Sequence, residues 1–242
     1  GRSAAQKGKR RGPRIAACLF ALLIAPFALD RLFPPNLTRL HAVGAEVQDR
    51  EGRILSVLPA PGGFWRLATV PEDVAPVLLD LLIAAEDRRF YDHVGVDPLA
   101  LARAAGQWLR AGRVVSGGST ITMQAARLLE PRPRGLRAKA IEIFRAFQLE
   151  ARFSKREILG IWLTLAPQGG NIEGMRAGAL AWFGRPAQRL DAAEAALLIA
   201  LARRPAALSP DRHAAAARAA RDDLLRRRAV AMLSAADQAL AL

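Results

Sequence analysis

Residues 77–93 read VLLDLLIAAEDRRFYDH, so an almost continuous apolar run passes directly into a charged segment. Such a run predicts a buried helix over Val77–Ala85. Glu86 follows it directly, and a carboxylate at the edge of an apolar helix loses part of its hydration, which suits a general base. The simpler interpretation, an ion pair between Glu86 and Arg88 or Arg89 at a solvated helix end, stays open on periodicity alone.

Outward from this helix, local patterns predict a mainly α body with a small β element. Residues 43–58 alternate polar and apolar around the turn sequence DREG at 49–52, which predicts a β-hairpin, and a short third strand is expected over 64–67. Asp97 before Pro98 predicts a helix N-cap, and two later segments have the spacing of capping boxes. The helices expected from these signals and from an Ala/Arg/Leu-rich segment span 98–112, 155–165, 192–204 and 213–233.

Composition limits the classes of protein that the chain can represent. The 242 residues are 52% hydrophobic, which favours a globular or membrane-associated chain over a disordered one. Lys and Arg number 36 against 22 Asp and Glu, a net charge of +14 that calls for an anionic neighbour such as nucleic acid, phospholipid or a phosphate-bearing substrate. Cys18 is the single cysteine, so an intramolecular disulfide is excluded and a zinc centre is improbable.

The N-terminal segment predicts a membrane anchor. Residues 1–14 contain six basic residues and no acidic one, and 15–29 are uncharged. A helix over 15–29 rises only about 22 Å, but extension to Phe33 gives about 28 Å, close to the hydrocarbon thickness. We therefore expect a cytoplasmic basic tail over 1–14 and a transmembrane helix over 15–33, with the rest of the chain outside the membrane. A cleaved signal peptide and a helix of a soluble protein are the alternatives.

Two further stretches favour the binding of an anion. Residues 116–124 read SGGSTITMQ, and glycines followed by hydroxyl residues at a helix start expose N–H donors, although an ordinary capped loop needs the same residues. Residues 127–139 carry five basic side chains against one acid and lead into a helix with Glu142. On a helical wheel, Lys139 and Glu142 share the side opposite Ile141, Phe144 and Phe147. They could form a solvated ion pair or a phosphate-gripping surface around a carboxylate.

Four motifs in order resemble those of one enzyme family. They are EDRRFYDHVG at 86–95, GGSTITMQ at 117–124, Lys139-x-x-Glu142 and SKREIL at 154–159. Together they resemble the family 51 glycosyltransferases, the peptidoglycan glycosyltransferases of class A penicillin-binding proteins and of monofunctional transglycosylases. The resemblance covers about residues 40–215. Met123 and the stretch APQGG at 166–170 look closest to the penicillin-binding protein 1C type.

The resemblance implies a lysozyme-like, mainly α fold with a small membrane-proximal β element, and an enzyme that polymerises lipid II. It implies that Glu86 is the general base for the 4-hydroxyl of lipid II, which attacks C1 of the lipid-linked strand with inversion and loss of undecaprenyl diphosphate. Lys139 would neutralise that diphosphate. The remaining residues that match substrate-binding positions of the family are Arg127, Arg134, Ser119, Thr120 and Gln124.

The resemblance implies that Glu142 is a second catalytic glutamate, with two roles open: orienting Lys139 or helping to hold a divalent cation such as Mg²⁺ or Mn²⁺. The sequence itself requires no cofactor and predicts no metal ligand set. His93 is expected to be a hydrogen-bonded structural residue, because a single histidine is weak evidence of catalysis. Thr164 stands where the family commonly has Asn. Ser-x-x-Lys and Lys-Thr-Gly, the motifs of penicillin-binding transpeptidase chemistry, do not occur in these residues.

The implied organisation divides the chain into a hairpin and jaw-entry segment over 34–70, a glycosyltransferase domain over 71–212 and a helical tail or linker start over 213–242. The implied partners are lipid II, the lipid-linked glycan strand, the membrane and other cell-wall synthesis proteins, with no nucleic acid. The implied location is the bacterial inner membrane, with one membrane pass and the catalytic domain outside. The alternatives are a lysozyme-like lytic muramidase, which needs no row of diphosphate-binding cations, and a non-enzymatic cationic module that binds a membrane surface or nucleic acid.

Overall fold

The structure is a computed structural model that describes residues 28–112 and 118–240, with the backbone alone at 105, 108, 109 and 228–240. The chain divides into two units, 1–35 and 36–242. In the first unit, residues 28–32 are helical. The predicted tail over 1–14 and most of the predicted anchor over 15–33 lie outside the described residues. Within 28–112 and 118–240, none of the helices combines the length and hydropathy that a membrane crossing requires.

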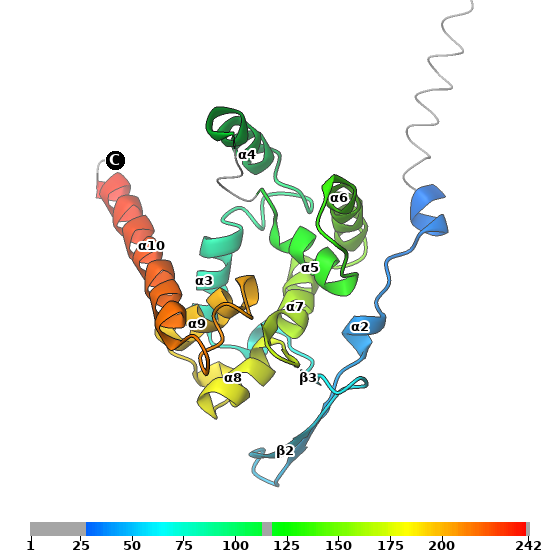
Figure 1. Ribbon diagram of the computed structural model, residues 1–242, viewed down its shortest axis with the longest axis vertical. Coiled ribbons are helices and arrows are strands. Elements are labelled where there is room, and N and C mark those ends of the chain that lie inside the picture. The colour runs from blue at the N-terminus through cyan, green and yellow to red at the C-terminus, as the bar shows by residue number, and fades with distance from the viewer. Residues whose placement is uncertain (1–27, 113–117, 241–242) are drawn as a thin grey trace, which may run out of the picture. The chain divides into compact units, whose positions relative to one another are not determined.

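The second unit is mainly helical, as the sequence predicts (Figure 1). Its helices begin early in the chain and continue to the last described residues. They are α2 (Thr38–His41), α3 (Pro76–Glu86), α4 (Pro98–Ala111), α5 (Ile121–Leu129), α6 (Leu136–Glu150), α7 (Lys155–Leu165), α8 (Met175–Phe183), α9 (Ala192–Arg203) and α10 (Ala214–Leu240), with short 3-10 turns η1 (Pro71–Asp73) and η2 (Ala187–Arg189).

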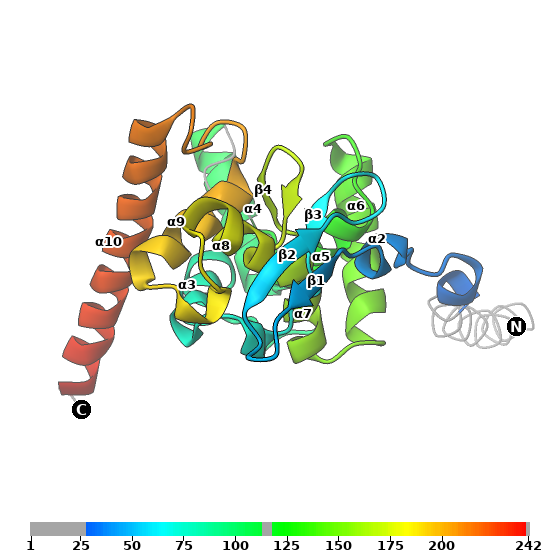
Figure 2. The same ribbon diagram turned by 90° about the horizontal axis from the view of Figure 1, so that it is seen from below.

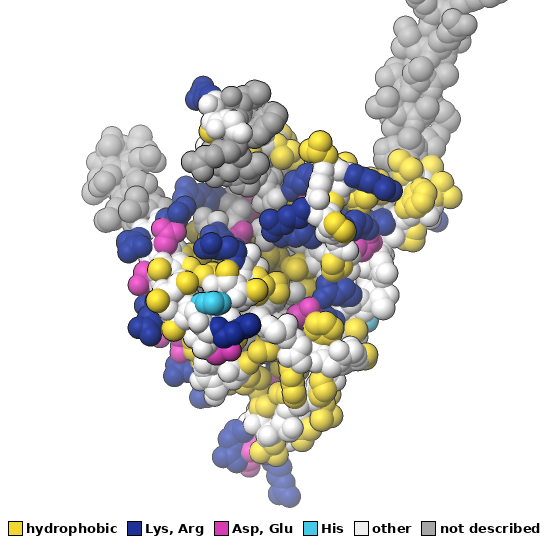
Figure 3. All heavy atoms as spheres, viewed as in Figure 1, with side chains coloured by type: hydrophobic (Ala, Val, Ile, Leu, Met, Phe, Trp, Pro, Cys, Tyr) yellow, Lys and Arg dark blue, Asp and Glu magenta, His cyan; other side chains and the backbone are white. Residues whose placement is uncertain are grey.

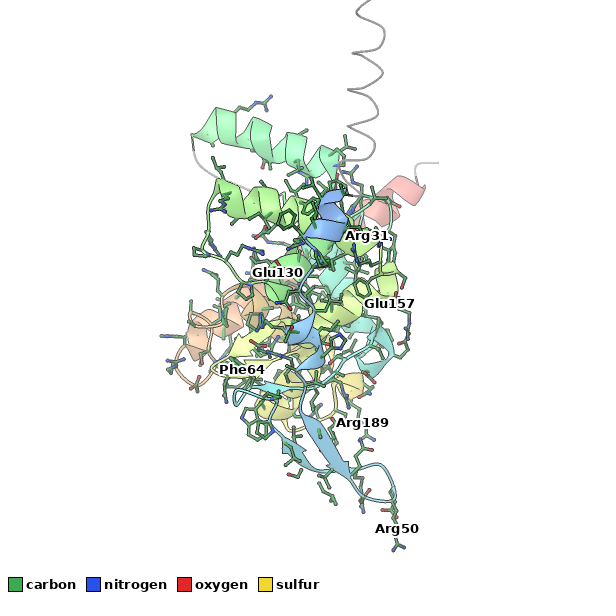
Figure 4. All side chains as sticks on the ribbon, turned by 90° about the vertical axis from the view of Figure 1, so that its right-hand side faces the viewer. Arg31, Arg50, Phe64, Glu130, Glu157 and Arg189 are labelled. Carbon is green, nitrogen blue, oxygen red and sulfur yellow. The ribbon has the colours of Figure 1, made fainter. Side chains whose placement is uncertain are left out.

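Two small sheets accompany these helices. Strands β1 (Ala45–Gln48) and β2 (Ile54–Leu58) form the predicted antiparallel hairpin. Its turn is built by Asp49, whose Oδ1 accepts the N–H groups of Glu51 at 3.0 Å and Arg53 at 2.8 Å, and Arg50 lies at its tip (Figure 4). The second sheet has the order β3-β5-β4, formed by β3 (Trp65–Arg66), β5 (Ile172–Glu173) and β4 (Pro167–Gly169), and β3 occupies the predicted third strand.

The apolar run over Val77–Ala85 holds helix α3 in the core. The side chains of Leu78, Leu81 and Leu82 are fully buried, which confirms a buried helix here. Helix α3 packs against α9 and α10, while α5 packs against α6 and α7 (Figures 1 and 2). Because α3 and α5 are each fixed on two sides, their ends are suited to hold side chains in defined positions.

The predicted helix starts are confirmed by their caps. The Ser154 and Asp191 boxes are both complete, and α7 and α9 begin directly after them. The side chain of Asp97 accepts the N–H of Ala100 at 3.0 Å, so α4 starts at Pro98 as expected. Helix α10 runs further than the predicted 213–233, because residues 234–240 contain neither Gly nor Pro to end it.

Helix α6 resolves the two interpretations of its polar side. Glu142 is only 8% exposed, whereas Phe147 is 47% exposed. The polar side therefore faces inward and part of the aromatic side faces outward, so Glu142 is not half of a solvated surface ion pair. An inward carboxylate is stable only with charged or polar partners, and those partners define the site described next.

Candidate active site

Glu86 is the last residue of α3, and its side chain points toward two other helices. Its carboxylate accepts a hydrogen bond from Nε2 of Gln124 in α5 at 2.8 Å and one from Nε of Arg203, the last residue of α9, at 2.5 Å. The Glu86 side chain is 11% exposed. The partners are thus not Arg88 and Arg89, the neighbours considered from the sequence, but side chains from two distant helices.

The amide of Gln124 can offer only its N–H groups to Glu86. The indole Nε1 of Trp162 donates to Oε1 of Gln124 at 3.1 Å. Because an indole nitrogen donates and never accepts, the amide oxygen must face Trp162 and the amide nitrogen must face Glu86. Trp162 is 2% exposed, so its own orientation is fixed by packing in α7.

The residue after Glu86 fastens the end of α3 to the start of α5. The carboxylate of Asp87 contacts Nε2 of His93 at 3.0 Å and accepts the backbone N–H of Ile121, the first residue of α5, at 3.0 Å. Both side chains of the Asp87–His93 pair are nearly buried. This confirms the interpretation of His93 as a hydrogen-bonded structural residue, and it places Glu86 and Gln124 within reach of each other.

A second cluster forms around the inward carboxylate of α6. Lys139 Nζ lies 3.2 Å from Oε2 of Glu142 and donates to Oγ of Ser119 at 2.5 Å. Nη1 of Arg127 lies 4.0 Å from the other oxygen of Glu142. The Lys139 side chain is 34% exposed and that of Arg127 is 40% exposed, so Glu142 holds two cations whose ends remain open to an anion.

Thr120 is a predicted binding residue whose hydroxyl is buried and used within the fold. Its Oγ1 caps α5 by accepting the N–H of Met123 at 3.1 Å and donates to the carbonyl of Gly95 at 2.6 Å. Thr120 is 2% exposed. The structure therefore does not bring this hydroxyl to the cleft, although the N-cap fixes the start of the helix that carries Gln124 and Arg127.

A pocket of about 210 Å³ lies between α5, α7 and the end of α9. Its lining includes both Gln124 and Arg203, the two side chains that hold Glu86, together with two further arginines and no acidic residue. The lining residues are Gln124, Arg127, Leu128, Arg134, Trp162, Ala166, Pro167, Ala202, Arg203 and Pro205. On the face of the second unit that Figure 3 shows, basic side chains gather around the middle.

Helix α5 connects the Glu86 cluster with the Lys139 cluster. Gln124 and Arg127 are three positions apart, so they share one face of α5, and both line the pocket. Gln124 contacts Glu86, and Arg127 faces the Glu142 carboxylate that also holds Lys139. The candidate base and the candidate diphosphate-binding lysine are therefore linked through adjacent turns of one helix.

The surroundings of Glu142 do not fit a divalent cation. Its two oxygens face Lys139 and Arg127, and a metal ion there would have to displace one of these positive charges. Across the described residues, no group of three His, Cys, Asp or Glu side chains is placed to hold a metal.

Two residues of the site were not predicted from the sequence. Arg203 lies 117 positions from Glu86, and Trp162 lies 38 positions from Gln124. The only local signal for Arg203 is a basic residue at the end of an otherwise apolar helix, which is equally typical of an ordinary helix C-terminus. A tryptophan in a buried helix carries no signal of its hydrogen-bond partner.

Comparison with known proteins gives one family and several relatives. The transglycosylase family profile matches residues 53–229. Penicillin-binding protein 1C of Escherichia coli (strain K12) is 43% identical over 216 residues, which are 89% of this chain and 28% of the relative. Penicillin-binding protein 1A of Aquifex aeolicus is 37% identical over 204 residues, 84% of this chain and 27% of the relative. The chain spans about a quarter of the length of these curated relatives.

Proposed function

The chain belongs to the transglycosylase family, as its four motifs predicted, and from this membership we propose that it is a peptidoglycan glycosyltransferase of the class A penicillin-binding protein type. The enzyme adds lipid II to a lipid-linked glycan strand. The bond between C1 of the strand and its diphosphate breaks, a bond from that C1 to the 4-oxygen of lipid II forms, and undecaprenyl diphosphate leaves.

This proposal rests on one observation: helix α5 links the Glu86 carboxylate to a pocket lined by cationic side chains. Gln124 and Arg127, on one face of α5, contact Glu86 and the Lys139–Glu142 pair respectively. Glycosyl transfer from a diphosphate needs a base on the acceptor side and fixed positive charge on the leaving-group side. The two clusters supply these two requirements.

Glu86 takes the proton of the attacking 4-hydroxyl. Each carboxylate oxygen has two lone pairs, so the hydrogen bonds from Gln124 and Arg203 leave room for a third partner. The proton moves to the carboxylate as the new C–O bond forms, which avoids a fully charged alkoxide.

Lys139, Arg127 and Arg134 stabilise the diphosphate that departs. The negative charge on its bridging oxygen grows as the C1–O bond breaks, and cations already in place stabilise that charge without reorganising. Ser119 and Glu142 hold Lys139 ready for this contact. Arg127 and Arg134 contribute planar groups that can bind two phosphate oxygens at once.

A membrane location follows from the same substrate chemistry. The polyprenyl chain of lipid II stays in the bilayer, so an enzyme fixed to that bilayer meets its substrate at a higher effective concentration. The basic segment over 1–14 and the apolar segment over 15–29 support an inner-membrane anchor with the catalytic unit outside. Leu32 and Phe33, at the described end of the predicted anchor over 15–33, are 71% and 57% exposed.

The pocket argues against the lytic muramidase. Cleavage of a finished glycan releases no diphosphate, and such enzymes work with a pair of carboxylates across the scissile bond. The lining here contains three arginines and no acidic side chain. Family membership likewise makes a purely non-enzymatic cationic module the weaker interpretation.

The test is polymerisation of labelled lipid II by the purified chain in detergent, with products separated by length. The unaltered protein should form glycan strands. We expect Glu86→Gln to lose at least about a hundredfold in rate, because the amide cannot accept the proton. Lys139→Ala should lose about a hundredfold or more, because one fixed cation of the leaving group is gone.

Glu72→Gln is the matched control, because Glu72 is also a glutamate paired with an arginine, Arg156, but lies on the surface at η1. It should keep the full rate. Circular dichroism should show the same helical content in all variants. Strand formation by Glu86→Gln at the control's rate would remove Glu86 as the base, and absence of strands with the unaltered protein would refute the proposed function.

A further inference from the structure

Arg203 joins the candidate base to the wall of the pocket, and it has no part in the mechanism above. Its Nε donates to Oε1 of Glu86 at 2.5 Å, and its Nη2 donates to the carbonyl of Ala85 at 2.9 Å. The same side chain lines the pocket with Arg127 and Arg134. A single guanidinium therefore contacts the base, the helix that carries the base, and the space that receives the substrate.

The planar fork of the guanidinium fixes the direction of the carboxylate. Two parallel N–H groups bind two acceptors that are adjacent in the chain, so Arg203 cannot follow Glu86 if that side chain rotates. Gln124 holds the other carboxylate oxygen from the opposite helix. Between them the two donors remove the rotational freedom that a glutamate at a helix end would otherwise keep.

The position of Arg203 is also favourable for α3 itself. The carbonyl of Ala85 lies in the last turn of α3, where carbonyl groups lack intrahelical donors. A cation at that end interacts favourably with the helix dipole. The Arg203 side chain is 43% exposed, so it pairs with Glu86 without being locked away from an entering substrate.

We propose that Arg203 is a positioning residue for glycosyl transfer, which holds the Glu86 carboxylate aimed at the pocket. This inference rests on the proposed function. A lysine would keep the charge but not the fork, because an ammonium group is a point charge without two parallel donors in a fixed plane. A glutamine would keep one donor but not the charge.

The other charged groups around Glu86 make contacts that differ from those of Arg203. Arg127 and Arg134 line the same pocket from α5 and the segment after it. Asp87 is adjacent in the chain and is paired with His93. Helix α10 also packs against α3, and it buries the apolar side chains of Ala217 and Leu224. None of these groups donates to the Glu86 carboxylate in the hydrogen bonds of the described residues.

The experiment measures kcat and KM for labelled lipid II with Arg203→Gln and Arg203→Lys. We expect Arg203→Gln to lower kcat about tenfold with little change in KM, because orientation of the base affects the chemical step more than binding. Arg203→Lys should recover only part of the kcat, because a single ammonium group cannot hold both acceptors in one plane.

Arg204→Gln is the matched control, because Arg204 is the next residue, is exposed, and does not line the pocket. It should leave kcat and KM unchanged. If Arg203→Gln retains the full kcat while the unaltered protein polymerises lipid II, this inference is overturned and the proposed function stands. If the unaltered protein makes no strands, the proposed function fails and takes the role of Arg203 with it.

A purely structural role would give another pattern. If Arg203→Gln unfolds at a lower temperature but keeps its kcat, Arg203 acts on the fold and not on the base. Should Arg203→Gln fail to fold at all, Arg203→Lys decides alone: full kcat contradicts the role of the planar fork, and a lowered kcat with an unchanged KM supports it.

Discussion

A buried tryptophan, Trp162, sets the orientation of the Gln124 amide. The Glu86 carboxylate therefore faces an N–H donor and not the amide oxygen. An amide side chain carries a donor and an acceptor of almost equal shape, so by itself it could face Glu86 either way. With its oxygen turned toward Glu86 it would repel the carboxylate. The hydrogen bond from Trp162 to that oxygen removes this choice.

This assigns a testable role to the Trp162 indole. We expect Trp162→Phe to lower the rate of lipid II polymerisation about tenfold, because the amide loses the contact that fixes its direction. The free energy of unfolding should fall by about 1–2 kcal/mol, because a buried hydrogen bond is lost. Both are measured on one preparation, by strand formation and by urea denaturation.

Trp182→Phe provides the comparison, because Trp182 in α8 also donates its indole N–H, to the carbonyl of Gln168 at 3.0 Å. It should lower stability but leave the rate intact. Equal rate losses in the two variants would mean that Trp162 acts on the fold in general and not on Gln124.

At the scale of single residues, the sequence predicts which side chains form the site but not which hydrogen-bond partners they have. Glu86, Gln124 and Lys139 were all found from motifs, because each motif is local. Their bonding could not be, since the partners of Glu86 come from helices that only the tertiary fold brings near. Thr120 shows the converse: its motif suggested a cleft residue, whereas its buried hydroxyl caps α5.

At the scale of the elements, the start of helix α4 is fixed by Asp97, a capping aspartate that also forms an ion pair. Asp97 accepts the N–H of Ala100 and a hydrogen bond from Nε of Arg89 at 3.1 Å. The guanidinium of Arg89 lowers the pKa of Asp97 to about 2, in spite of partial burial. The folded-state pKa therefore lies below the value of about 3.9 expected for the unfolded chain.

The stabilisation by ionised Asp97 should be present above about pH 4 and be lost as the pH falls toward 2. Asp97→Asn keeps a capping oxygen but not the charge, so we expect its stability deficit relative to the unaltered protein to narrow as the pH is lowered from 5 to 2.5. Asp97→Ala also loses the cap and should be less stable than Asp97→Asn by about 1 kcal/mol. Urea denaturation over that pH range measures both differences. A deficit that stays constant with pH would contradict the assigned ion pair.

Helix boundaries were the most predictable part of the fold because caps are local. The starts of α4, α7 and α9 follow from residues within three positions of each boundary. The facing of α6 was less predictable. A helical wheel separates its two sides but does not say which side other elements will cover, and here they cover the side with Glu142.

At the scale of the molecule, one buried ionic cluster joins the first residues of the second unit to its later strands. Arg66 in β3 donates to Glu173 in β5 at 2.8 Å and to the carbonyls of Arg39 and Ala42 at 2.8 and 2.7 Å. Arg39 in turn donates to Glu173 at 2.7 Å. Arg66 and Glu173 are 107 positions apart, so no local pattern could have predicted this cluster.

Because Arg39 also donates to the carbonyl of Leu128, the cluster reaches the end of α5, the helix that carries Gln124 and Arg127. Just beyond it, the backbone N–H of Asn36 donates to Glu130 at 2.7 Å. Burial alone would raise the pKa of Glu130, but the Asn36 N–H and the guanidinium of Arg132 hold it below its usual value. The residues that follow Pro35 are thus fixed to the helix that links the two halves of the site.

Glu173→Gln should therefore destabilise the whole unit and not only one strand. Arg66 is 3% exposed, and removing the charge of its partner leaves a buried guanidinium without a counterion. We expect the free energy of unfolding to fall by about 3 kcal/mol in urea denaturation. Glu72→Gln, which breaks an exposed pair with Arg156, should have a far smaller effect, because solvent replaces the lost contact. If the two variants unfold at the same urea concentration, the cluster does not hold the N-terminal residues to the core, and their link to the end of α5 rests on the hydrogen bond from the Asn36 N–H to the Glu130 carboxylate.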